Sequence, residues 1–235
     1  TKDNIIEGSL LLNHAFRRNL IMTTGADISR AGLKSSQITS GQKNVIFGDA
    51  YLQVEWNVLK SIDLLPGIRW EQHSSYGNHI NPSMNAKWSL SDRISLRGSA
   101  SRGFRAPSIK ELYFIFDHSA AGYIVYGGGN QLNPETSNNY SLTAELNYDR
   151  RGLHRLTYFR NDLNNLIDFG LDGFSSTYWR GIYTYQNIFK ARTEGLEWES
   201  KVKICTGWDL SFSYTYLRAR DLTTKTDLVN RPRNT

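Results

Sequence analysis

The sequence alternates between apolar and polar residues over long stretches, with the period of two that is typical of β-strands. Between Tyr140 and Tyr148, for example, every second residue is apolar or aromatic, and the residues between them are polar or charged. The same alternation recurs regularly in residues 50–56, 62–71, 84–90, 94–101 and 208–216, and less regularly in residues 5–14, 19–29, 153–169 and 183–204. We therefore predict about ten strands and no helix. These strands are expected to have roughly ten residues each, whereas strands of globular proteins usually have about five or six.

The connections between the predicted strands alternate in length along the chain. Short ones lie near residues 15–18, 58–60, 91–93, 149–152 and 205–207, and longer ones near residues 30–45, 73–80, 103–134, 170–182 and from residue 218 onward. An up-and-down antiparallel sheet with tight turns at one rim and long loops at the other produces this order, which is typical of outer-membrane barrels. Sandwiches with Greek-key connections do not keep it.

A lipid environment accounts for both patterns. No run of about 18 apolar residues occurs, so a transmembrane helix is excluded. A barrel can still cross a bilayer, because its strands satisfy one another's backbone groups and carry apolar residues only on the outer face. Aromatic residues occur towards the strand ends, where interfacial girdles are expected: Trp70, Trp88, Tyr140, Tyr148, Trp208 and Tyr216. The sequence predicts an all-β chain that forms part of an up-and-down antiparallel transmembrane β-barrel. The alternative is a soluble all-β domain with these aromatic residues in its core.

Composition excludes several other classes of protein. The net charge of +6 is spread along the chain rather than clustered, which does not favour a nucleic-acid partner. Cys205 is the single cysteine, so an internal disulfide is excluded. The sequence carries no nucleophile elbow, zinc motif or convincing pair of catalytic carboxylates, and we do not predict an enzyme.

The connection from Gly103 to Pro134 is the longest in the chain, and it is rich in aromatic residues. Loops of this length are usually functional or disordered, and disordered segments are poor in aromatic residues. We expect a ligand-handling loop mounted on the sheet.

Several motifs resemble those of TonB-dependent outer-membrane receptors. The segment from Ser101 to Tyr113 contains the GFRAP-type motif, and the segment from Gly129 to Ser137 resembles the family's NPNL-KPE-S segment. Tyr185 to Glu197, Ser213 to Asp221 and Asn230 to Asn234 resemble later strand motifs of the same barrels. The motif residues carried over are Phe104, Arg105, Ala106, Pro107, Asn130, Leu132, Pro134 and Glu135. Arg105 and Pro107 are expected to shape the loop base, and Glu135 and Glu194 are expected to bind lumen arginines.

This resemblance implies a fold and a function. The family's barrel has about 22 strands around an N-terminal plug, so residues 1–235 would be a barrel fragment of about ten strands, without the plug and the terminal strands. It implies a bacterial outer-membrane location and TonB-energised uptake of a scarce large solute: a ferric siderophore, haem or cobalamin. The implied partners are outer-membrane lipid, the TonB complex through segments outside this chain, and an extracellular small molecule. No tightly bound cofactor is implied.

The ligand is left open by the sequence. Haem receptors of the family resemble one another in holding a histidine between the two loop motifs, and His118 has this position. A neutral imidazole can ligate haem iron. Aromatic residues of the loop could shield a porphyrin: Tyr113, Phe114, Phe116, Tyr123 and Tyr126. The alternatives are a ferric siderophore, cobalamin, or a peptide or glycan, with His118 an ordinary loop residue.

Two other classes compete with a TonB-dependent receptor. A passive porin-like barrel would share the strand pattern but gives no reason for the loop motifs. A soluble β-rich carbohydrate-binding module would use surface aromatic residues as platforms, and it should have shorter strands and no alternation of short and long connections.

Overall fold

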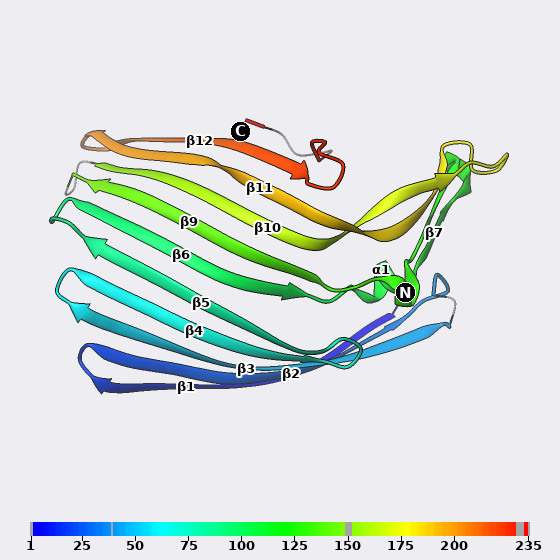
Figure 1. Ribbon diagram of the computed structural model, residues 1–235, viewed down its shortest axis with the longest axis horizontal. Helices are drawn as coiled ribbons and strands as arrows, with labels where there is room; N and C mark the ends of the chain where they lie inside the picture. The colour runs from blue at the N-terminus through cyan, green and yellow to red at the C-terminus, as the bar shows by residue number, and fades with distance from the viewer. Residues whose placement is uncertain (1, 39, 149–151, 229–232, 235) are drawn as a thin grey trace.

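The computed structural model describes residues 2–38, 40–148, 152–228 and 233–234, and these form one curved twelve-stranded sheet (Figure 1). The long strands are β1 (Lys2–Arg17), β2 (Leu20–Lys34), β3 (Gln42–Leu59), β4 (Ile62–His73), β5 (Gly77–Ser89), β6 (Ile94–Arg105), β9 (Glu135–Asn147), β10 (Gly152–Gly173), β11 (Gly181–Cys205) and β12 (Trp208–Asp221). The connection between β6 and β9 contains α1 (Ile109–Tyr113), β7 (Ile115–His118), the 3₁₀ turn η1 (Ser119–Ala121), β8 (Tyr123–Tyr126) and the 3₁₀ turn η2 (Gly129–Gln131).

Each long strand pairs antiparallel with the next, as an up-and-down sheet requires. Figure 1 shows tight turns at one end of the sheet and the longer connections at the other. The prediction of an up-and-down antiparallel sheet is confirmed, and the predicted strands correspond to β1–β6 and β9–β12. Residues 149–151 of the turn predicted at residues 149–152, and residues 230–232 of the motif at residues 230–234, lie outside the described residues.

Three details of the sequence prediction are wrong. The loop at residues 103–134 contains a helix and a β-hairpin, whose elements of three to five residues are too short to show a period. The ten long strands have 12 to 25 residues rather than about ten. The extra length comes from hairpins that continue beyond the alternating segments, so much of the predicted loops at residues 30–45 and 170–182 is strand.

The register separates the residues of the sheet into an apolar face and a polar face. One cross-strand row of the apolar face is Gly98, Leu142, Tyr158, Leu196 and Tyr216. On the polar face, the hydroxyls of Ser99 and Ser141 are 2.7 Å apart, those of Thr143 and Thr157 are 2.9 Å apart, and Arg155 bridges Glu145 and Glu199. Glu194 shares the parity of Leu196 and lies on the apolar face, so the prediction that it binds a lumen arginine is wrong.

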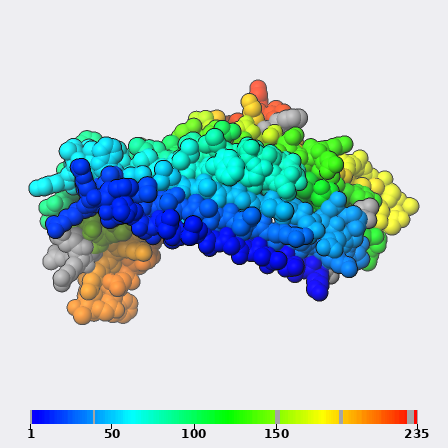
Figure 2. All heavy atoms as spheres, turned by 90° about the horizontal axis from the view of Figure 1, so that it is seen from below, coloured from blue at the N-terminus to red at the C-terminus, as the bar shows by residue number. Residues whose placement is uncertain are grey.

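The few buried apolar residues gather at the loop end of the sheet rather than beneath its middle. One cluster consists of Leu33, Ile38 and Phe114, and a second consists of Leu112, Leu132 and Ile167. Figure 2 views the molecule from the β1 side, where the exposed β1 runs along the edge. In the described part of the chain, no helix has the length and apolar character needed to cross a membrane.

The two faces predict opposite responses to a charge at adjacent positions. Ala86 lies on the apolar face, in the uncharged row that contains Leu142 and Tyr158, whereas Asn85 lies on the polar face. Ala86→Arg is expected to lower the free energy of unfolding of the full-length receptor in phospholipid vesicles by about 2–4 kcal/mol, because a lipid-facing arginine within the apolar band loses its hydration. Asn85→Arg is the control and should have little effect. If urea unfolding shows that both variants lose the same free energy of unfolding, this assignment of the faces is contradicted.

Candidate ligand-binding site

The GFRAP-type segment ends β6 and begins a short helix. Ser108 caps α1: its backbone N–H donates to Glu111 Oε2 at 2.7 Å, and the Glu111 N–H donates to Ser108 Oγ at 3.2 Å. This reciprocal capping box satisfies backbone donors at the helix start. The helix therefore begins at Ile109, directly after its cap, and it contacts η2 and β3.

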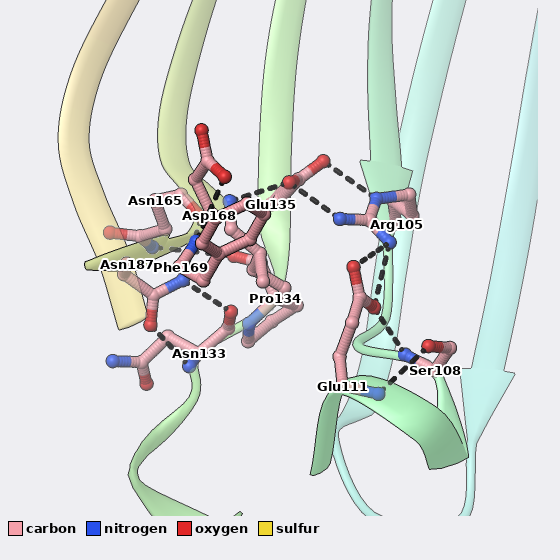
Figure 3. Close-up of polar contacts among 11 residues, drawn as sticks. Arg105, Ser108, Glu111, Asn133, Pro134, Glu135, Asn165, Asp168, Phe169 and Asn187 are labelled. Carbon is pink, nitrogen blue, oxygen red and sulfur yellow. Dashed lines mark hydrogen bonds and ion pairs between the residues drawn. The ribbon is translucent and has the colours of Figure 1, made fainter. Parts of the chain in front are cut away.

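Arg105, the last residue of β6, joins three segments of the loop base (Figure 3). Its Nε and Nη2 donate to the two Glu135 carboxylate oxygens at 2.7 and 2.6 Å, and its Nη1 donates to Glu111 at 3.0 Å. Glu135 is the first residue of β9 and is only 8% exposed, and its Oε1 also accepts from the Ile167 N–H of β10 at 2.7 Å. The two motifs that flank the loop in sequence are thus tied together by one guanidinium.

A second set of contacts holds the end of the loop, and it centres on an amide that the sequence did not single out. Asn187 of β11 accepts from the Asn133 N–H at 2.8 Å and donates to the Asn133 and Asn165 carbonyls at 2.9 and 2.7 Å. Asn165 donates to the Pro134 carbonyl at 3.3 Å from a left-handed conformation with φ 56°. Asn187 lies within the family motif at residues 185–197, and this motif is the sequence feature that could have identified it. These contacts connect the NPE-type segment to both β10 and β11.

The β7–β8 hairpin is attached to the end of β11 by a parallel pairing, in which Gly181 lies opposite Tyr123 and Tyr183 opposite Val125. Gly122, which precedes β8, has φ 78°, and a Cβ there would be 2.5 Å from the Trp179 indole. A side chain at this position would therefore push Trp179 away and strain the backbone. The Arg180 N–H donates to the Gly122 carbonyl at 2.7 Å, which adds to the attachment.

A hollow of about 450 Å³ opens between this hairpin and the ends of β10 and β11, and we call it the aromatic hollow. Its lining residues are Phe116, His118, Tyr123, Val125, Phe169, Arg180, Tyr183 and Tyr185. The His118 and Tyr123 rings stack with centroids 4.8 Å apart, and Phe169 meets Tyr183 and Tyr185 edge-on at 5.8 and 6.1 Å. Arg180 supplies a cation beside these rings. Such a surface suits a ligand with aromatic rings and negative charge.

The structure brings three of the five predicted loop residues together in the aromatic hollow: Phe116, His118 and Tyr123. Tyr126 is three positions beyond Tyr123 in β8, so it belongs to the opposite face of the hairpin. Tyr113 packs against both buried clusters, and its hydroxyl donates to Asn130 Oδ1 at 3.4 Å. Phe114, also considered for shielding, is 2% exposed and so cannot contact a ligand.

The family-motif residues have structural positions around the loop base. Leu132 is buried with Leu112 and Ile167, while Asn130 lies in η2. Phe104 stacks on His79, with ring centroids 3.7 Å apart. Ala106 and Pro107 line a second, more apolar hollow of about 510 Å³ beside β1–β3.

Sequence reasoning missed the other five residues that line the aromatic hollow: Val125, Phe169, Arg180, Tyr183 and Tyr185. Tyr183 and Tyr185 are two positions apart, a spacing that could have indicated a shared strand face. The hollow itself was not predictable, because it depends on the parallel contact of β8 with β11. Among the described residues, no group of three or more His, Cys, Asp or Glu side chains could hold a metal ion.

Comparison with known proteins identifies the family. The family model for the TonB-dependent receptor-like β-barrel matches residues 9–235, and the chain belongs to this family. The chain is 33% identical over 170 residues to the ferric enterobactin receptor of Pseudomonas aeruginosa, covering 66% of this chain and 22% of the receptor. It is 28% identical over 160 residues to heme/hemopexin utilization protein C of Haemophilus influenzae, covering 59% of this chain and 23% of that protein.

The fold agrees with that assignment. The chain resembles the crystal structure of the siderophore receptor PirA from Pseudomonas aeruginosa with a TM-score of 0.79 and 26% identity, over 92% of this chain and 42% of that structure. The chain spans less than a quarter of the length of the two sequence relatives. The family model and the enterobactin protein are both described as receptors, which supports the prediction that the chain is not an enzyme.

Removing the Arg105 guanidinium should loosen the loop base. Arg105→Gln leaves the Glu111 and Glu135 carboxylates without their cation, and we expect a local loss of about 2 kcal/mol. Hydrogen exchange of the full-length receptor should then be faster at the Ile167 amide and in α1. Arg155→Gln, which also removes a guanidinium from two carboxylates, is the control and should leave both segments unchanged. Unaltered exchange in the Arg105 variant would contradict the role assigned to this residue.

The same contacts predict a pH dependence at α1. Burial opposes ionisation of the Glu111 carboxyl, but hydrogen bonds from Arg105 and Ser108 outweigh it and hold the pKa of Glu111 below its usual range. A carboxyl with a lowered folded-state pKa stabilises the fold above its ordinary pKa of about 4.3, and this contribution is lost as the pH falls through the lowered value. Protection of the α1 amides should therefore decrease below about pH 4. In Glu111→Gln this change should be absent, and an identical decrease would exclude Glu111 as its source.

Proposed function

We propose that this chain is a wall segment of an outer-membrane receptor that takes up an iron complex in a TonB-dependent manner. Membership of the receptor family supports this proposal. The apolar face of the sheet, and the loop at residues 103–134 that Arg105 holds at its base, support it as well. The passive-pore alternative gives no role to the Arg105 contacts, and the soluble carbohydrate-binding module predicts shorter strands than those observed. The proposed partners are outer-membrane lipid, the TonB complex through segments outside this chain, and an extracellular ligand.

We infer that the ligand is an iron complex of an aromatic siderophore that carries negative charge. The observation that carries this inference is the aromatic hollow, in which Arg180 accompanies five aromatic rings and His118. Rings of the ligand would stack on or meet the tyrosines, and its acidic oxygens would accept hydrogen bonds from the guanidinium. The similarity to a ferric enterobactin receptor supports the same class of ligand.

Haem is the second candidate, and the position of His118 favours it. The imidazole lines the hollow and stacks on Tyr123, so a planar macrocycle could lie over the same aromatic rings. The similarity to heme/hemopexin utilization protein C adds support. Cobalamin remains a prediction from the family resemblance, and no residue of the aromatic hollow favours it.

Titration of the full-length receptor with ferric enterobactin and with haem tests the two candidates. Arg180→Gln should weaken binding of the siderophore complex by about tenfold or more, because a charge-assisted hydrogen bond contributes roughly 1.5–3 kcal/mol. Lys110→Gln removes a cation from α1, outside the hollow, and should bind as the unaltered receptor does.

The haem titration is read from the Soret absorbance band. A shift that His118→Ala abolishes would establish haem as the ligand and His118 as an axial ligand of its iron. If Arg180→Gln does not change siderophore binding and haem causes no Soret shift, both ligands proposed for the aromatic hollow are contradicted. The family membership does not depend on either result.

A further inference from the structure

Two cross-strand rows on the apolar face carry charge where the apolar band ends. The row nearer the loops consists of Arg102, Asn138, Asp162, Arg192 and Arg220, on β6, β9, β10, β11 and β12. The next row towards the tight turns consists of Ala100, Tyr140, Arg160, Glu194 and Arg218. We call the five arginines of these rows the outer arginine cluster. The rows contain two carboxylates, Asp162 and Glu194, and a third, Asp227, lies 3.9 Å from Arg220, so the five arginines still outnumber the carboxylates around them.

At the level of the row nearer the loops, charge is confined to the apolar face of the sheet. At the same level, the opposite face presents the uncharged row Ser101, Asn139, Asn161, Thr193 and Ala219. The next two rows of the apolar face towards the tight turns are uncharged and mostly aliphatic or aromatic; the second of them is Leu96, Ala144, Leu156, Trp198 and Tyr214. The outer arginine cluster therefore begins directly beyond the apolar band, on the face directed away from the lumen. It cannot serve a ligand that passes through the barrel.

Part of the cluster is already organised by ion pairs. Arg160 donates to Asp162 Oδ2 at 2.7 Å, and Arg192 donates to Asp162 Oδ1 at 2.5 Å, so one carboxylate holds two guanidinium groups. The Arg160 and Arg192 side chains are still 37% and 29% exposed. Arg102 is exposed as well. Guanidinium groups bind phosphate through parallel N–H donors, and a row of them along neighbouring strands offers several such donors to one ligand.

We propose that the outer arginine cluster binds the phosphorylated headgroup of a lipid in the surrounding leaflet. This inference rests on the proposed membrane location, because the apolar rows would hold the acyl chains while the arginines meet the headgroup. Long arginine side chains at the end of an apolar band reach the interface in this way. The positive excess is complementary to an anionic headgroup, whereas a zwitterionic headgroup would gain little from it.

The test measures binding of a fluorescently labelled, bisphosphorylated glycolipid to the full-length receptor in detergent micelles. The triple variant Arg102→Gln, Arg218→Gln and Arg220→Gln spares the Asp162 ion pairs, and we expect its affinity to fall on the order of a hundredfold. The charge-matched control removes three cations from the polar face: Lys87→Gln, Arg97→Gln and Lys201→Gln. It should bind the glycolipid as tightly as the unaltered receptor.

Several outcomes would overturn the proposal. The triple variant could bind the glycolipid as tightly as the unaltered receptor does. The receptor could bind labelled phosphatidylcholine as tightly as it binds the glycolipid. Inorganic phosphate could displace the glycolipid fully when it is present at the same concentration. Ferric enterobactin titration of the same preparations checks folding, because the aromatic hollow does not include the cluster. If the triple variant does not fold, Arg102→Gln and Arg218→Gln alone should each weaken glycolipid binding, and no loss in either rejects the proposal. If the receptor binds the glycolipid but neither ferric enterobactin nor haem, the ligands proposed for the aromatic hollow are rejected and the lipid site stands.

Discussion

The backbone hydrogen-bond ladder between neighbouring long strands is the constraint on which the rest of this structure depends. In hydrocarbon an unpaired N–H or C=O is costly, so each spanning strand has to be bonded along its length by its neighbours. That requirement explains why strands of 12 to 25 residues pair in sequence order, with tight turns at one rim. It also fixes which side chains share a face, because a register shift of one residue would exchange the apolar and polar sets.

The ladder leaves the loop rim free to vary, and there side-chain contacts replace backbone pairing as the organising interaction. Arg105 ends β6 and binds both Glu135, where β9 begins, and Glu111 in α1. Asn187 connects the same region to β11. A loop held at its base in this way can present the β7–β8 hairpin at a defined position on the sheet. The aromatic hollow is the product of that positioning.

The two faces of the sheet also differ in how their charged residues are arranged. On the polar face, charges are paired across strands, as in the Arg155 bridge between Glu145 and Glu199. On the apolar face, charge begins only beyond the aliphatic and aromatic rows, and there arginines outnumber carboxylates. The same ladder therefore positions a ligand-facing surface at the rim and a lipid-facing surface around it.

Much of the fold was predictable from sequence, because a period of two and the alternation of connection lengths are local properties that strand pairing preserves. The alternation predicts that Leu142 and Ser141 lie on opposite faces, and the register agrees. The family motifs likewise marked Arg105 and Glu135, though not their contact. The aromatic hollow could not be predicted: Tyr126 lies away from it, and Arg180 enters it from the predicted loop at residues 170–182. Its membership was decided by the tertiary structure, because parallel pairing of β8 with β11 joins segments distant in the chain, and no local periodicity records such a contact.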